Sequence, residues 1–146
     1  MKPPAEIPLT DITDDAIADS LANNALRMNV EPLLHEIRHA LKRLIDTGEA
    51  SMIDLKAIPM APGEEEDIRE ALGRGEVEIL MDAMGPSKLY ETAYPGVWWV
   101  EHRNIENELT GVYIEIAHVP EIIPANQKDL HEGLDNLVRS LTVGVE

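Results

Sequence analysis

Four of the five aromatic residues of the chain fall within ten positions, and phenylalanine is absent: Tyr90, Tyr94, Trp98 and Trp99. Each buried Trp removes roughly 150 to 250 Å² from water, which is worth about 4 to 6 kcal/mol. The two Trp lie in an apolar run after Pro95-Gly96, a pattern typical of a strand. Because successive side chains of a strand point to opposite faces, the two indoles cannot enter one core. Either both faces of the sheet are covered, or one Trp is left for a binding partner.

Length and composition predict one ordinary globular domain, because 146 residues with 44% hydrophobic content can bury a sizeable core. Residues 1–12 are rich in Pro and weakly periodic, so we expect an extended lead-in before a single domain at 13–146. Cysteine is absent, which excludes disulfides and metal centres held by thiolates of this chain. We expect no cofactor.

The charge balance is acidic, with 12 Lys and Arg against 28 Asp and Glu and a formal charge of -16. Such a chain repels phosphate backbones and anionic lipid, which argues against nucleic acid and membrane partners. Two interpretations remain open: the acidity only keeps the protein dispersed, or it attracts a basic peptide. The N-terminal residues lack the apolar core of a signal peptide, and no apolar run reaches 18 residues, so we expect a cytoplasmic protein.

Helical periodicity predicts four helices. The first begins at Thr13, with Ile17, Leu21 and Ala22 on one stripe, and the second runs from a cap at Asn29 to Gly48 with the apolar stripe Leu33, Leu34, Ile37, Ala40, Leu41, Leu44 and Ile45. A short acidic helix follows from Glu64 to Gly73. The last helix carries a stripe that we expect to pack back on the sheet, formed by Leu130, Leu134, Leu137, Val138 and Leu141.

Alternating or apolar segments predict five strands, at 52–58, 76–81, 89–92, 97–102 and 110–116. The first two flank the acidic helix and favour a right-handed βαβ unit. The remaining strands are separated by short turns at Gly85-Pro86 and Pro95-Gly96, which favours antiparallel hairpins. The expected fold is therefore a layered α+β domain, in which a five-stranded mixed but largely antiparallel sheet packs with about four helices.

One string matches a metal-site pattern: His35-Glu36-Ile37-Arg38-His39 has the H-E-x-x-H form of zinc hydrolases. At 100° per residue, however, His35 and His39 point away from the apolar stripe of their helix, so a zinc ion there would lie in solvent. No third ligand follows at a familiar spacing. We therefore expect no metal site and no catalytic residue, and keep a zinc-dependent hydrolase built on His35, Glu36 and His39 as the alternative function.

The segment Gly73 to Trp99, GRGEVEILMDAMGPSKLYETAYPGVWW, resembles the C-terminal domain of the HupH/HyaF hydrogenase expression and formation proteins. Leu33 to Leu55, Pro62 to Asp67 and Tyr113 to Ile123 agree with that resemblance, which covers about residues 31–142. Its most specific part is a G-x-G-E-V block followed by E-T-x-x-P-G-V-W. Carried over from this motif, with Trp99 added, the candidate partner-binding residues are Gly75, Glu76, Glu91, Thr92, Pro95, Gly96, Val97, Trp98 and Trp99.

The resemblance implies a non-enzymatic, chaperone-like accessory protein for maturation of an uptake nickel-iron hydrogenase. Its implied partner is the iron-sulfur small subunit, which usually bears a basic twin-arginine signal, or another hydrogenase accessory protein. Longer family members hold two related copies of the domain, whereas this chain has one. A homodimer is therefore a further hypothesis. A third reading of the Trp pair stays open, in which both indoles are plain core and the binding surface lies elsewhere.

Overall fold

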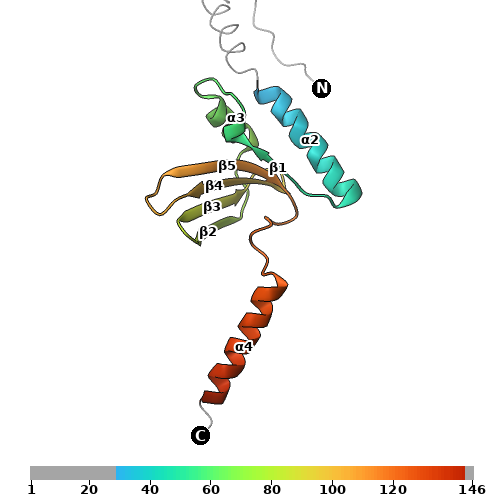
Figure 1. Ribbon diagram of the computed structural model, residues 1–146. Coiled ribbons are helices and arrows are strands. Elements are labelled where there is room, and N and C mark those ends of the chain that lie inside the picture. The colour runs from blue at the N-terminus through green and yellow to red at the C-terminus, as the bar shows by residue number, and fades with distance from the viewer. Residues whose placement is uncertain (1–28, 144–146) are drawn as a thin grey trace, which may run out of the picture.

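A computed structural model describes residues 29–143 of the chain. Its elements, in order, are α2 (Val30–Thr47), β1 (Ser51–Asp54), a 3-10 turn η2 (Leu55–Ala57), α3 (Glu64–Leu72), β2 (Glu78–Asp82), β3 (Pro86–Glu91), β4 (Val97–Arg103), β5 (Leu109–Ile116) and α4 (Gln127–Val143). The lead-in at 1–12 and the helix expected from Thr13 lie outside the described residues. Figure 1 shows the sheet with α2 and α3 on one side and α4 on the other.

The five strands form one sheet in the order β1-β5-β4-β3-β2, and every neighbouring pair is antiparallel. This confirms the expected α+β fold. The expected βαβ unit does not form with its two strands side by side. β1 and β2 run in the same direction, but they form the two opposite edges of the sheet. Short connections join β2 to β3, β3 to β4 and β4 to β5, so these hairpins build the sheet from the β2 edge to β5, and β1 pairs with β5 at the other edge.

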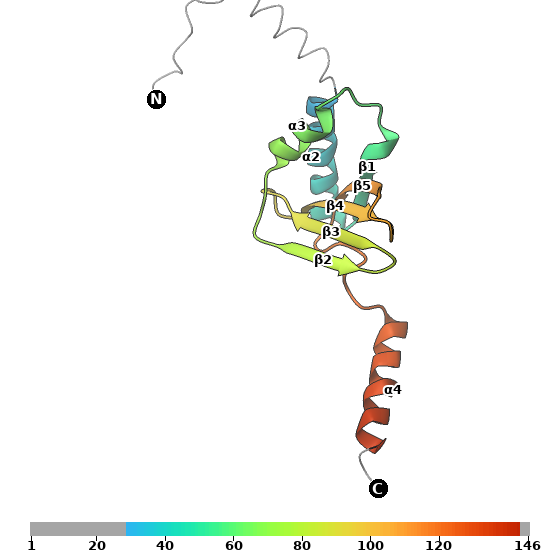
Figure 2. The ribbon, with the colours of Figure 1, turned by 90° about the vertical axis from the view of Figure 1, so that its left-hand side faces the viewer.

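The main core lies between one face of the sheet and the helix layer. Figure 2 shows α2 and α3 together on that side of the sheet. Helix α2 contributes Leu33, Ile37, Ala40 and Leu44, and the sheet contributes Tyr90, Val97, Trp99, Val112, Ile114 and Ile116. The helix ends as expected at Gly48, which adopts the left-handed conformation at φ 74°. Its expected apolar stripe divides into two rows, because Leu34 and Leu41 are only partly buried and Ile45 is 80% exposed.

The first strand is shorter than the alternating pattern of 52–58 predicts. It ends at Asp54, whose side chain accepts a hydrogen bond from the backbone N–H of Lys56 at 2.9 Å. This Asp cap begins the 3-10 turn η2, in which Leu55 is buried. A local hydrogen bond from side chain to backbone thus replaces the strand that the alternation favours.

The second face of the sheet carries a smaller apolar cluster made by Leu89, Trp98 and Val100, with Ile79, Met81, Tyr113 and Ile123 packed against it. Trp98 is 4% exposed on this face, while Trp99 is 0% exposed on the other. The expectation that the two indoles diverge is confirmed. Of the two alternatives left open by the sequence, the structure shows the one in which both faces are covered. On the Trp98 side the cover includes the segment after β5, which is held by a 2.8 Å hydrogen bond from the N–H of Glu121 to the buried carboxylate of Glu115.

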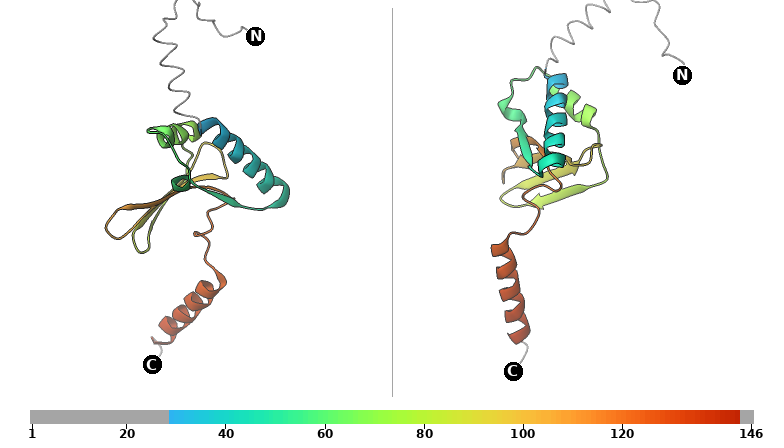
Figure 3. Two further views of the ribbon diagram at one scale, coloured as in Figure 1. Left: turned by 45° about the horizontal axis from the view of Figure 1, so that its top comes forward. Right: turned by 90° about the vertical axis from the view of Figure 1, so that its right-hand side faces the viewer.

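Helix α4 does not pack back on the sheet, which corrects the expectation for the last helix. Its five stripe residues are 49 to 66% exposed: Leu130, Leu134, Leu137, Val138 and Leu141. In Figures 1 and 3 the helix projects away from the sheet. The second face, where such a helix would pack, is already contacted by Ile123, and Pro124 follows directly. No helix within residues 29–143 is long and apolar enough to cross a membrane.

Candidate functional site

The turn between β3 and β4 contains three of the nine candidate residues, Thr92, Pro95 and Gly96, and is closed by hydrogen bonds across its ends. The backbone N–H of Thr92 donates to the carbonyl of Val97 at 2.9 Å, and the N–H of Val97 donates to the carbonyl of Tyr94 at 3.0 Å. The buried hydroxyl of Thr92 lies 3.2 Å from both the N and the O of Tyr94. The Thr of the motif therefore shapes the turn from inside.

Gly96 brings this turn close to helix α2. It adopts a left-handed φ of 89°, and a Cβ there would lie 3.4 Å from Cδ2 of Leu41. Its carbonyl also accepts a 2.9 Å hydrogen bond from the N–H of Ala117, just after β5. The Pro-Gly pair thus lets the backbone turn against the helix and the end of β5 at once.

Gly75 joins the two halves of the motif, which lie far apart in the sequence. Its N–H donates to the carbonyl of Glu91 at 2.7 Å. A Cβ at this position would lie 2.6 Å from the carbonyl oxygen of Thr92 and 2.8 Å from Oε1 of Glu91, distances that real Cβ atoms do not reach. Only glycine allows so close a backbone approach. The G-x-G-E block and the E-T-x-x-P-G-V-W block therefore form one structural unit.

The candidate residues divide by exposure. Four have buried side chains and hold the unit together: Thr92, Val97, Trp98 and Trp99. Glu91 and Gly96 are partly exposed, whereas Gly75, Glu76 and Pro95 lie at the surface. A partner that docks on the intact fold reaches the surface group, together with Tyr94, which is 51% exposed.

An apolar groove of about 510 Å³ lies where this turn meets α2. Its lining is Leu34, Ile37, Arg38, Leu41, Lys42, Ile45, Asp46, Leu72 and Tyr94. Sequence reasoning placed Leu34, Leu41 and Ile45 in the core stripe and did not identify this groove. The available signal was the width of the stripe, since seven apolar positions on one helix are more than a single buried row needs.

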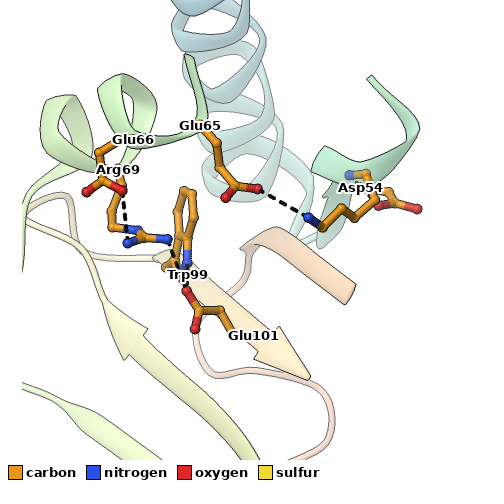
Figure 4. A network of polar contacts seen from close by, with 7 residues as sticks. Asp54, Glu65, Glu66, Arg69, Trp99 and Glu101 are labelled. Atoms are coloured by element: carbon orange, nitrogen blue, oxygen red, sulfur yellow. Dashed lines mark hydrogen bonds and ion pairs between the residues drawn. The ribbon is translucent and has the colours of Figure 1, made fainter. Parts of the chain in front are cut away.

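A polar network fixes Trp99 under α3, as Figure 4 shows. The guanidinium of Arg69 lies 5.1 Å from the centre of the Trp99 ring and pairs at 3.2 Å with both Glu66 and Glu101. The Trp99 indole N–H donates to the same Glu101 carboxylate at 3.0 Å. This network is structural, because each charged group within it has a partner and the indole is fully buried.

Tyr90 extends that layer toward Gly73 and Arg74. Its ring stacks on Trp99 with centroids 6.4 Å apart, and the Arg74 guanidinium lies 3.9 Å from its centre. Burial raises the pKa of the Tyr90 hydroxyl, and the positive charges of Arg69 and Arg74 oppose that shift in part.

The H-E-x-x-H string does not form a metal centre among the described residues. His35 and His39 are exposed on the side of α2 opposite to its buried row, and Nε2 of His35 lies 3.8 Å from the Glu31 carboxylate. Within 29–143, no three His, Asp or Glu side chains gather in a way that could hold a metal ion. The zinc hydrolase alternative therefore gains no support.

The motif unit and its fold match known proteins. Residues 27–143 match the family described as "HupH hydrogenase expression protein, C-terminal conserved region". The chain belongs to this family. A solved structure, the hydrogenase expression protein HupH from Thiobacillus denitrificans ATCC 25259, is similar with a TM-score of 0.75 and 45% sequence identity, over 78% of this chain and 95% of that chain.

Curated members of the HupH family are longer. The hydrogenase expression/formation protein HoxQ of Azotobacter vinelandii is 29% identical over 75% of this chain and 40% of its own length. HupH of Rhizobium leguminosarum bv. viciae is 28% identical over 72% of this chain and 37% of its own length. The chain thus spans about two fifths of the curated relatives that it matches.

Proposed function

We propose that this protein is a non-enzymatic accessory factor for the maturation of an uptake nickel-iron hydrogenase, with a chaperone-like role toward the iron-sulfur small subunit. The observation that carries the proposal is the HupH family match over residues 27–143, supported by relatives named hydrogenase expression/formation proteins. Without cysteine, the chain supplies no thiolate for a cluster, so it acts on the polypeptide that binds one.

The groove between α2 and the motif turn is the proposed binding surface. Tyr94 and Ile45 expose large apolar side chains at its rim, and its floor is formed by half-buried Leu34 and Leu41. A concave apolar surface with a few charged groups at its edge suits an apolar segment of an incompletely folded subunit. The motif glycines shape this surface. Gly96 lets the turn pack closely against Leu41 of α2, and Gly75 packs against the Thr92 carbonyl at the start of the turn.

The acidic charge of the chain supplies the second element of recognition. The groove rim itself carries Arg38, Lys42 and Asp46, so attraction to a basic twin-arginine signal comes from the overall charge of -16. Such a field speeds encounter more than it strengthens the final contact. The groove then provides the short-range apolar contacts.

The test is quantitative capture of the small subunit from cells that express the hydrogenase operon, detected with an antibody against that subunit. The double variant Tyr94→Ala with Ile45→Ser should lose most of the captured subunit and keep its thermal unfolding temperature, since both side chains are exposed. The matched control is Ile105→Ser, an equally exposed change (83%) in the loop between β4 and β5. Undiminished capture by the double variant would exclude the groove.

Hydrogenase activity provides the second measurement. A strain that lacks this gene should be restored by the wild type and by Ile105→Ser, and much less by the groove variant. If the deletion leaves hydrogenase activity and small-subunit processing unchanged, the maturation role itself is wrong. The two measurements thus separate failure of the proposed surface from failure of the proposed function.

A further inference from the structure

Helix α4 carries a leucine seam that nothing in the described chain covers. Leucine recurs with spacings of four, three and four residues: Leu130, Leu134, Leu137 and Leu141. This is the alternation of a and d positions in a heptad, the pattern by which one helix packs against another. All four side chains are more than half exposed, and no residue of α4 is buried. Among residues 29–143 the seam therefore has no packing partner.

The edges of this seam carry no carboxylate. With Leu134 at an a position, the flanking e and g positions are His131, Gly133, Val138 and Ser140. The charged side chains lie at outer positions instead: Lys128, Asp129, Glu132, Asp135 and Arg139. In a chain with a net charge of -16, most surfaces repel a second copy, but the flanks of this seam do not.

The tether of α4 limits what the helix can reach within its own chain. Ile123 packs against the Trp98 cluster, and only residues 124–126 separate it from the first residue of α4. The Asn126 side chain fixes that start by accepting a 2.8 Å hydrogen bond from the N–H of Asp129. Three extended residues span at most about 10 Å. Helix α2, which lines most of the groove, lies on the other side of the sheet from α4 (Figure 3).

We propose that α4 pairs with α4 of a second copy of this chain in an antiparallel helix pair. Leu130 of one copy then faces Leu141 of the other, and Leu134 faces Leu137. The antiparallel direction follows from charge, because it places the two acidic bodies at opposite ends of a pair about 25 Å long. This length exceeds the Debye length of about 8 Å at physiological ionic strength. The contact is isologous and therefore closes as a dimer.

The helix pair forms in a monomer–dimer equilibrium that depends on protein concentration. Two helices of 17 residues form a small interface, well below the roughly 1,600 Å² of standard stable complexes. A helix this short also owes most of its stability to packing of its apolar face. Dimer formation and α4 helicity should therefore rise together as protein concentration increases. The inference does not depend on the proposed function, since it follows from α4 and its tether alone.

Disulfide trapping tests both the partner and the direction, because the chain has no cysteine of its own. Leu130→Cys and Leu141→Cys are prepared separately, then mixed and oxidised mildly. The antiparallel pair predicts a disulfide-linked dimer in the mixture and little in either variant alone. Strong crosslinking of each variant alone would show a parallel pair and overturn the antiparallel assignment. Crosslinking of Leu141→Cys to Ile45→Cys instead would place α4 in the α2 groove and overturn the proposal.

Sedimentation equilibrium gives a second, independent readout. Leu134→Glu should abolish the dimer of the otherwise unmodified chain without changing unfolding of the sheet domain, because Leu134 contacts no core. Asn136→Glu adds the same charge on the outer side of the same helix and should leave the dimer in place. A wild-type protein that stays strictly monomeric at millimolar concentration would overturn the proposal.

Discussion

The indole N–H of Trp98 donates a hydrogen bond to the backbone carbonyl of Ala117 over 3.1 Å, and both residues are buried. Ala117 is the first residue after β5, and its own N–H donates to the carbonyl of Gly96. The family motif therefore holds the start of the segment that covers the second face of the sheet. Trp98 therefore stabilises the fold itself, whereas the motif turn contributes Tyr94 to the groove beside α2.

Replacing Trp98 should show how much that hydrogen bond contributes to stability. Trp98→Phe keeps an aromatic ring but leaves the buried Ala117 carbonyl without this donor, which should lower the free energy of unfolding by about 1–3 kcal/mol. Urea denaturation followed by circular dichroism measures the loss. Trp99→Phe is the comparison, since its acceptor Glu101 keeps Arg69 as a partner. Equal losses in the two variants would show that the Ala117 bond contributes nothing specific.

Gly75 should tolerate no side chain. In Gly75→Ala the added methyl group would meet the Thr92 carbonyl at 2.6 Å, so the two motif blocks must separate. We expect the free energy of unfolding to fall by about 1–3 kcal/mol, as for other overpacked sites. Gly133→Ala is the matched control, because a Cβ there meets nothing within 4 Å and alanine favours an exposed helix by about 1 kcal/mol. Unaltered stability of Gly75→Ala would contradict the close approach.

Tyr90 should make the fold sensitive to alkaline pH. Burial raises its pKa in the folded state, so above pH ~10 the unfolded chain releases this proton while the folded protein retains it. The contribution of Tyr90 to the free energy of unfolding is therefore fully present below the pKa of the unfolded state, and it is lost as the pH rises through the pKa of the folded state. Tyr90→Phe should remove that part of the alkaline loss.

Tyr90→Phe should lower the free energy of unfolding by less than about 1 kcal/mol at pH 7, because the Tyr90 hydroxyl has no hydrogen-bond partner in the described part of the chain. Unfolding free energies measured from pH 7 to 11 test both statements. Tyr94→Phe controls for the loss of a tyrosine hydroxyl from a half-exposed position. The assignment to Tyr90 is wrong if the two variants change the pH profile equally.

Electrostatic attraction to the small-subunit signal should weaken with salt. The Debye length falls from about 30 Å at 0.01 M to about 8 Å at 0.15 M ionic strength, so the association rate of a twin-arginine peptide should drop severalfold over this range. Stopped-flow fluorescence of a labelled peptide measures the rate. A peptide with both arginines replaced by glutamine should show a much smaller change. Insensitivity of the arginine peptide to salt would mean that the acidity does not steer binding.

Local periodicity predicted much of this fold because it depends only on neighbouring residues. The divergence of Trp98 and Trp99 follows from strand geometry, and the end of α2 at Gly48 follows from the ease with which glycine adopts a left-handed conformation. These two features need no knowledge of distant parts of the chain. The family motif named Gly75 and Gly96 only as candidate partner-binding residues, and their close approach to Thr92 and Leu41 depends on the tertiary structure.

Only the tertiary structure decided which apolar surfaces are covered. The stripe of α4 and the outer row of α2 have the same periodicity as buried helices, yet Leu137 and Ile45 are exposed. On the second face of the sheet, Ile123 packs against the Trp98 cluster, and α4 begins only four residues later without joining it. Sequence thus determined the faces of each element, and long-range packing determined which of those faces remain free for a partner.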